Sequence, residues 1–255
     1  MLEQWIGSFL GIWPRYASGL GAVLGAPIAE TEVRAHSGLF ADAVTFWAIS
    51  TFFHLVTRYI AWSHSAPGTL WFVAQFVTWA VSLVGVALAF TAAGRLAGGR
   101  AGTGQVLSAT AYLWAAVIPV QAVLMLVGFG LMEVIDPRVY AMGVASATGC
   151  LQLADPWAAI DWLTESARTR PVAYVAGYGL LAVIFLAIAI IDLVYGIAYL
   201  RVLRRLQGLG RGRFAVMVAA GVVLSLLALS LAEFFGWVLW KAQAECGAVS
   251  GMPPR

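Results

Sequence analysis

Residues 172–200 read VAYVAGYGLLAVIFLAIAIIDLVYGIAYL. This stretch holds a single charged side chain, that of Asp192, and it is longer than the ~20 apolar residues that a helix needs to cross a bilayer. A soluble protein would have to bury every side of such a helix, whereas lipid covers it directly. The stretch therefore predicts a transmembrane α-helix.

The rest of the chain has the same character. Of its 255 residues 62% are hydrophobic and 11% are charged, against about 25% charged residues in an ordinary soluble domain. Four more apolar runs reach the length of a spanning helix: 39–61, 69–93, 105–132 and 214–240. We therefore expect an all-α fold, a polytopic membrane helix bundle with about five transmembrane helices.

The uneven distribution of basic residues between the runs predicts the orientation. Arg95 and Arg100 lie between the second and third runs, and five arginines lie in 201–213, with no acid in either segment. In the alternate segments, 62–68 has no Arg or Lys, and 133–171 has five acids against three arginines. Because Arg and Lys favour the cytoplasmic side in short loops, we expect the N-terminus inside and the C-terminus outside.

These boundaries divide the chain into three parts. Residues 1–38 form a cytoplasmic-side amphipathic and juxtamembrane segment, and 39–240 form the five-helix transmembrane domain with its outer loop at 133–171. Residues 241–255 form an outer C-terminal tail. The membrane part is thus expected to be one domain.

A helix start is visible inside the outer loop. Asp155 precedes Pro156, which combines an N-cap side chain with a proline at the first helical position. A short helix is therefore expected there, either on the outer membrane surface or as a lid over the bundle.

The N-terminal segment begins with a helical stripe. Trp5, Phe9 and Trp13 follow one another at intervals of four residues on one face. The stripe is too short to cross the ~30 Å hydrocarbon core, and Trp favours the headgroup level. We expect Pro14 to end this helix and a second juxtamembrane helix to follow over 17–29. The stripe is either an interfacial anchor or a face packed against the bundle.

Ionisable side chains inside the predicted spans are candidates for function, because burying them in lipid is costly. His54 and Arg58 share a face near the outer end of the first span, and Glu233 lies at a similar depth in the last. An ion pair between Arg58 and Glu233, with His54 beside it, would serve either as part of a proton or substrate relay or as a structural pin.

Two carboxylates, Asp42 and Asp192, are expected at similar depths in the inner half. Together they would bind a cation or a proton. Either would equally neutralise Arg95 or Arg201 at the interface, and neither belongs to a recognisable metal motif.

The two cysteines, Cys150 and Cys246, both fall on the predicted outer side. In an oxidising compartment they would be able to form a disulfide if their Cα atoms lie within about 7 Å. Two cysteines do not suffice for a disulfide scaffold or a four-ligand metal site.

No arrangement typical of a catalytic or cofactor centre is recognisable. The three histidines share no motif with a nucleophile, and the Gly-rich segment at 208–212 lacks the Lys and Ser or Thr of a phosphate loop. The basic residues are not interleaved with aromatics, as single-strand nucleic-acid binding requires. We therefore expect no enzyme, no cofactor and no nucleic-acid partner.

One stretch carries a family resemblance. Residues 94–105 read GRLAGGRAGTGQ and lead into a helix with Ala109, Tyr112 and then Pro119. This pattern resembles the Yip domain family of polytopic membrane proteins, and in particular its bacterial relatives. The five-span layout over 39–240 is similar as well. The Asp-Leu-Tyr-Gly-Pro stretch of the eukaryotic branch is missing, so the resemblance does not extend to GTPase binding and carries over no functional residue.

The expected function is that of a non-enzymatic integral membrane scaffold or accessory subunit. The alternative is a small transporter or permease subunit that uses the intramembrane charges. The expected partners are the lipid bilayer and either another membrane protein or further copies of this chain. The composition, rich in Ala and Arg and poor in Lys, fits a GC-rich bacterial genome and hence the bacterial inner (cytoplasmic) membrane.

Overall fold

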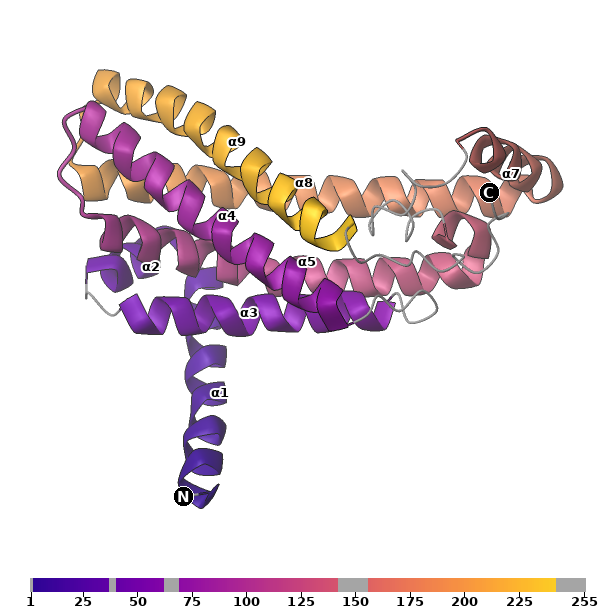
Figure 1. Ribbon diagram of the computed structural model, residues 1–255, viewed down its shortest axis with the longest axis horizontal. Coiled ribbons are helices and arrows are strands. Elements are labelled where there is room, and N and C mark those ends of the chain that lie inside the picture. Colours follow the sequence, from indigo (N-terminus) through magenta and orange to yellow (C-terminus); the bar gives the residue numbers. More distant parts are fainter. Residues whose placement is uncertain (1, 37–39, 62–68, 142–155, 242–255) are drawn as a thin grey trace. The chain divides into compact units, whose positions relative to one another are not determined.

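The computed structural model describes residues 2–36, 40–61, 69–141 and 156–241 (Figure 1). Within these ranges every regular element is an α-helix, and there is no strand. The all-α prediction is thereby confirmed. The helices are α1 (Leu2–Gly25), α2 (Pro27–His36), α3 (Phe40–Ala61), α4 (Thr69–Leu96), α5 (Thr103–Ile135), α7 (Pro156–Thr169), α8 (Pro171–Gln207) and α9 (Arg211–Lys241).

Five of these helices, α3, α4, α5, α8 and α9, are long and apolar enough to cross a membrane. They coincide with the five predicted runs, although several extend further. The largest extension is that of α8, which continues through Arg201, Arg204 and Arg205 to Gln207. Arginine is a strong helix former, so hydropathy marks where a helix leaves the apolar layer and not where it ends. The N-in, C-out orientation stays a prediction.

The expectation that Pro14 ends the first helix is wrong. Helix α1 runs through Pro14 to Gly25, and the break falls between Gly25 and Pro27 instead of after 29. A proline inside a helix removes one backbone hydrogen bond, which packing beyond it can offset. Here Tyr16, two residues past the proline, packs on α3. At the real break, a glycine ends one helix and a proline occupies the first position of the next.

The chain divides into two compact units. The first comprises Met1–Phe52, Phe76–Pro119 and Asp192–Gly236, and the second comprises Phe53–Gln75, Val120–Ile191 and Trp237–Arg255. Helices α3, α4, α5, α8 and α9 therefore contribute to both.

Two clusters of buried apolar side chains form the core of the first unit, and α5 takes part in both. One cluster joins α5 to α4, α8 and α9 and includes Leu113, Leu203 and Met217, each at most 1% exposed. The other joins α5 to the first turns of α3 through Phe46 and Tyr112. Helix α5 is accordingly the central helix of this unit.

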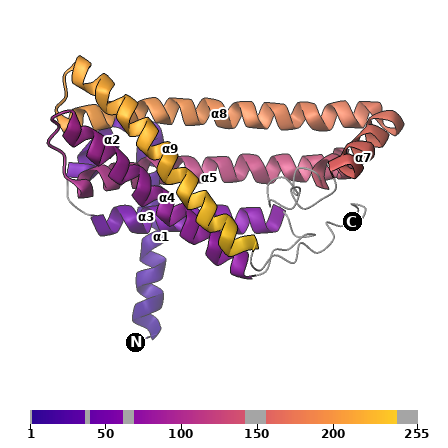
Figure 2. The same ribbon diagram turned by 45° about the horizontal axis from the view of Figure 1, so that its top comes forward.

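Glycines allow α4 and α9 of the first unit to lie side by side (Figure 1, Figure 2). A Cβ atom added at Gly85 on α4 would come within 2.9 Å of the Cβ atom of Ala228 on α9. Added Cβ atoms at Gly221 and Gly236 on α9 would likewise meet the side chains of Phe90 and Thr78. Small residues at such contacts bring helix backbones close, as is typical of helix packing in membranes.

Candidate functional site

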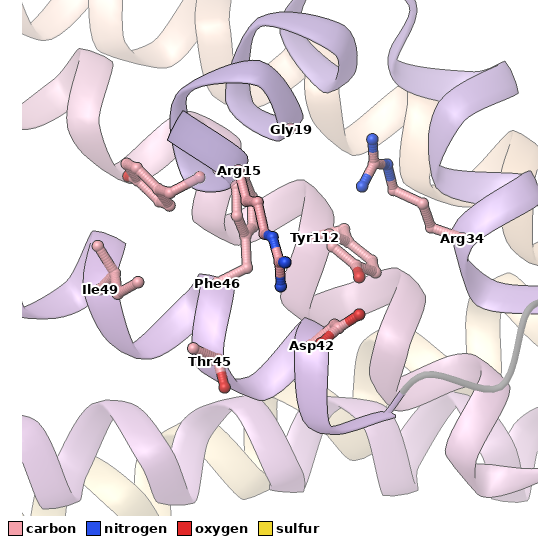
Figure 3. A pocket seen from close by; sticks show the side chains of 9 residues that line it. Arg15, Gly19, Arg34, Asp42, Thr45, Phe46, Ile49 and Tyr112 are labelled. Carbon is pink, nitrogen blue, oxygen red and sulfur yellow. The ribbon is translucent and has the colours of Figure 1, made fainter. Parts of the chain in front are cut away.

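A cavity lies at the start of α3, where α1, α2, α3 and α5 of the first unit meet (Figure 3). Its volume is about 180 Å³. We call it the Arg15/Asp42 pocket. Its lining combines aromatic, basic, acidic and hydroxyl side chains, namely Arg15, Tyr16, Gly19, Arg34, Asp42, Thr45, Phe46, Ile49 and Tyr112.

Aromatic rings form one wall of the pocket. The ring of Phe46 contacts those of Tyr16 and Tyr112, at centroid distances of 4.9 Å and 5.5 Å. The hydroxyl of Tyr16 also lies 2.7 Å from Ser50 Oγ, so a hydrogen bond joins α1 to α3. Burial raises the pKa of the Tyr16 hydroxyl, which the hydrogen bond to Ser50 partly offsets. This hydroxyl is therefore neutral at physiological pH.

The charged side chains of the pocket are only partly neutralised by one another. The guanidinium carbon of Arg34 lies 5.6 Å from the ring centroid of Tyr112, and its Nε lies 3.4 Å from Glu30 Oε2. Arg15 extends past Phe46 toward Asp42 (Figure 3). In the described part of the chain, neither Arg15 nor Asp42 has an ion-pair partner within 4.0 Å. Both charges are thus available to a ligand.

Contacts of α1 and α2 with α8 relate the pocket to the arginine-rich end of α8 within the first unit. Arg205 Nη1 lies 2.9 Å from Glu32 Oε2, and the hydroxyl of Tyr195 donates to the carbonyl oxygen of Leu24 at 3.5 Å. The ion pair is largely exposed and therefore worth at most about 1 kcal/mol. It nevertheless shows that α2 lies at the basic end of α8, the end predicted to face the cytoplasm.

The five apolar helices decide the class of protein, by their length and composition. The chain is an integral membrane protein. No protein family, curated protein or solved structure matches it. The resemblance of residues 94–105 to the Yip domain family therefore stays a prediction.

The two predicted inner carboxylates have different surroundings. Asp42 lines the pocket, whereas Asp192 lies exposed on α8 and is not part of its lining. In the described ranges, no group of three or more His, Cys, Asp or Glu side chains is placed to hold a metal ion. Asp42 thus belongs to this cavity together with other charged groups, and Asp192 does not.

The predicted outer charges belong to different units. His54, 4% exposed, and the partly buried Arg58 lie one turn apart on the part of α3 that belongs to the second unit. The carbonyl oxygen of His54 accepts a hydrogen bond from Thr57 Oγ1 at 2.8 Å. Glu233 is exposed on α9 in the first unit. The ion pair between Arg58 and Glu233 stays a prediction.

Several predicted residues lie outside what the structure describes. These are Cys150 and Cys246, together with the side chains of Trp5 and Phe9. The third member of the N-terminal stripe, Trp13, is 44% exposed and makes an edge contact with the ring of Tyr16 at 6.3 Å. The interfacial-anchor interpretation and the disulfide both stay predictions.

Sequence reasoning missed Gln207, which connects α8 to the Gly-rich segment after α4. Its side chain is 1% exposed, and its Oε1 accepts a hydrogen bond from the backbone N–H of Ala101 at 3.0 Å. Added Cβ atoms at Gly94 and Gly99 would both collide with this side chain. Gly94 and Gly99, which belong to the stretch with the family resemblance, therefore leave the space that the Gln207 side chain fills. We call this space the glycine socket. Sequence offers no signal for such a contact between distant segments.

Asp136 in the second unit was also missed, although the sequence contains a signal for it. Its carboxylate is buried, accepts hydrogen bonds from the backbone N–H groups of Arg138 and Val139 at 3.0 Å and 3.4 Å, and accepts one from Ser166 Oγ at 2.9 Å. Pro137 follows it, so the pair repeats the Asp–Pro pattern that predicted α7. Asp136 thus caps one helical turn and holds α7, whose existence is confirmed.

Proposed function

We propose that this protein is a non-enzymatic membrane scaffold or accessory subunit that contacts a partner membrane protein mainly through α8. The observation that carries the proposal is the low burial of this helix. The membrane-spanning windows of α3, α4 and α5 are 44%, 50% and 50% buried, whereas those of α8 and α9 are 6% and 17% buried. Most of the apolar, membrane-spanning part of α8 is thus available to a neighbouring helix, whereas the end of α8 near Gln207 packs in the core.

The pattern on α8 supports this role. Exposed side chains recur every three or four residues along the helix, which gives one continuous apolar face. A Cβ atom added at Gly179, in the middle of that face, would meet nothing. Small residues let a second helix approach closely, because association in lipid relies on packing and not on the hydrophobic effect. We call this surface, which lies in the second unit, the α8 face: Val172, Val175, Gly179, Val183, Leu186 and Ile190.

The chemistry of the chain is consistent with a role in binding. The buried polar groups described above, Gln207 and Asp136, hold helices and loops together. The resemblance of 94–105 to the Yip domain family is part of the proposal, since that family consists of polytopic membrane proteins. Localisation in a bacterial inner membrane likewise belongs to the proposal and rests on the Ala- and Arg-rich composition.

The test is purification of the tagged protein from its native membrane in a mild detergent, followed by mass spectrometry of what stays bound. We expect a stoichiometric partner that is lost in Gly179→Leu. The matched control is Gly196→Leu, because Gly196 is also exposed with open space around it but lies about 100° away around the helix.

Retention of the partner by Gly179→Leu would contradict the α8 face as the contact. A protein that is recovered alone, with no partner and no further copies, would contradict the scaffold itself. That result would favour the transporter alternative and lead to transport assays on variants of His54, Arg58 and Glu233.

A further inference from the structure

The Arg15/Asp42 pocket contains charges of both signs that face a cavity without pairing with each other. We propose that it binds the headgroup of a phospholipid that carries both a phosphate and a primary ammonium group. The phosphate would lie against Arg15 and Arg34, and the ammonium against Asp42. The site uses α1, α2, α3 and α5, and it does not depend on the α8 face.

The phosphate half of the site follows from the two arginines. A guanidinium group offers planar, paired N–H donors that match phosphate oxygens. Arg15 is exposed and has no ion-pair partner among the described residues, so its donors are open to a ligand. Arg34 approaches the pocket over the ring of Tyr112, which orients its guanidinium group.

The ammonium half follows from Asp42 and the balance of charge. Arg34 lies 3.4 Å from Glu30, so the two arginines and the two acids, Glu30 and Asp42, sum to zero. A headgroup without net charge keeps that balance, whereas a purely anionic headgroup would leave the site with one uncompensated negative charge. The aromatic wall of the pocket also suits a bound cation.

The position of the pocket favours a lipid over a soluble ligand. Asp42, Thr45 and Phe46 belong to the first two turns of the membrane-spanning part of α3, and Ile49 lies deeper, at the middle of that span. The end of a spanning helix lies at the level of the lipid headgroups. Phe46 and Ile49 also provide an apolar edge toward the hydrocarbon layer. A headgroup bound there would leave its acyl chains beside the helix, in the bilayer.

The experiment is native mass spectrometry of the full-length protein in detergent, titrated with phosphatidylethanolamine and, in parallel, with phosphatidylglycerol. We expect the wild-type protein to retain phosphatidylethanolamine preferentially. Asp42→Asn should reduce this preference about fivefold, the size expected for one partly exposed charge pair, while phosphatidylglycerol still binds. Arg15→Gln should weaken binding of both lipids. Arg211→Gln, an exposed arginine of α9 outside the pocket, is the matched control and should change neither.

Equal retention of the two lipids by the wild-type protein, or an unchanged preference in Asp42→Asn, would overturn the proposal. A titration with soluble phosphoethanolamine separates the two sources of this headgroup, and displacement of the lipid at equimolar concentration would overturn the assignment to a lipid. Asp42 is exposed, so Asp42→Asn should fold, and its thermal unfolding is recorded first. If Arg15→Gln fails to fold, the preference measured on Asp42→Asn decides alone.

Discussion

Helices α3 to α5 and helices α8 and α9 are all long and apolar, but they are packed very differently. About half of each spanning window is buried in the first group, against 6% in α8 and 17% in α9. The two helices with the highest mean hydropathy are the least buried. In a soluble protein the order would be reversed. In a bilayer, lipid covers the most apolar surfaces, and protein–protein contacts select small and weakly polar residues instead.

The contacts of α8 show how a nearly uncovered helix is held. In the second unit, Gly177 lies next to Val139, and the side chain of Ile184 fills the space at Gly128. In the first unit, the hydroxyl of Tyr199 lies 2.9 Å from Thr110 Oγ1, and Gln207 occupies its glycine socket. Helix α8 is therefore fixed at a few points, which leaves the α8 face free.

The difference between buried and exposed helices should have its largest effect at glycines. Gly85→Leu forces a side chain into the contact between α4 and α9 and should cost about 3 kcal/mol, the upper range for overpacking. Gly179→Leu, on the exposed α8 face, should be neutral or slightly stabilising, because leucine favours the helix. Thermal unfolding in detergent of the chain freed of its partner, followed by tryptophan fluorescence, measures both. Equal losses would mean that the α8 face is covered in the purified protein.

A smaller effect is expected at Asp136, which holds α7 in the second unit. Asp136→Ala removes the acceptor for Ser166 and for two backbone N–H groups, and should cost about 2 kcal/mol. Asp161→Ala, an exposed carboxylate on α7, is the control and should stay within about 0.5 kcal/mol. Proteolysis of the loop around α7 should accelerate only in Asp136→Ala. Unchanged proteolysis would show that other contacts hold α7.

The smallest of these effects is expected at Gln207, the contact at the end of α8. Gln207→Ala leaves the backbone N–H of Ala101 without its acceptor and empties the socket, at a cost of about 1.5 kcal/mol. The control is Arg205→Ala, because its ion pair with Glu32 is largely exposed and worth about 0.5 kcal/mol. Hydrogen exchange at Ala101 should increase in the first variant only. Unchanged protection of the Ala101 amide in both variants would show that the glycine socket does not depend on Gln207.

Local signals predicted several elements correctly, and the errors have a common origin. The Asp–Pro pair at 155–156 predicted α7, and the same pair at 136–137 would have predicted the cap at Asp136. The expectation that Pro14 ends the first helix was wrong because it considered only the residues next to the proline in the sequence. The packing of Tyr16 on Phe46 and its hydrogen bond to Ser50, which support the helix beyond Pro14, involve residues 30 or more positions away.

The candidate site likewise combines a residue that a local signal identifies with residues that only tertiary contacts bring together. Asp42 was identified from sequence because a carboxylate in an apolar run is conspicuous. Arg15, Arg34 and Tyr112 were not connected with it, since they come from three other helices. Asp192 was paired with Asp42 by depth alone. Depth constrains one coordinate of a residue, whereas lining the same pocket also requires the right helix neighbours and the right face.

By itself, the sequence determined the five apolar helices, because transfer into lipid depends on the composition of about 20 consecutive residues and on little else. Tertiary structure alone decided which of those helices are covered and which remain exposed. It also decided that Gln207 fits a glycine socket and that two arginines and an aspartate share one cavity. These features depend on shape complementarity between helices distant in the chain, which no local pattern of residues encodes.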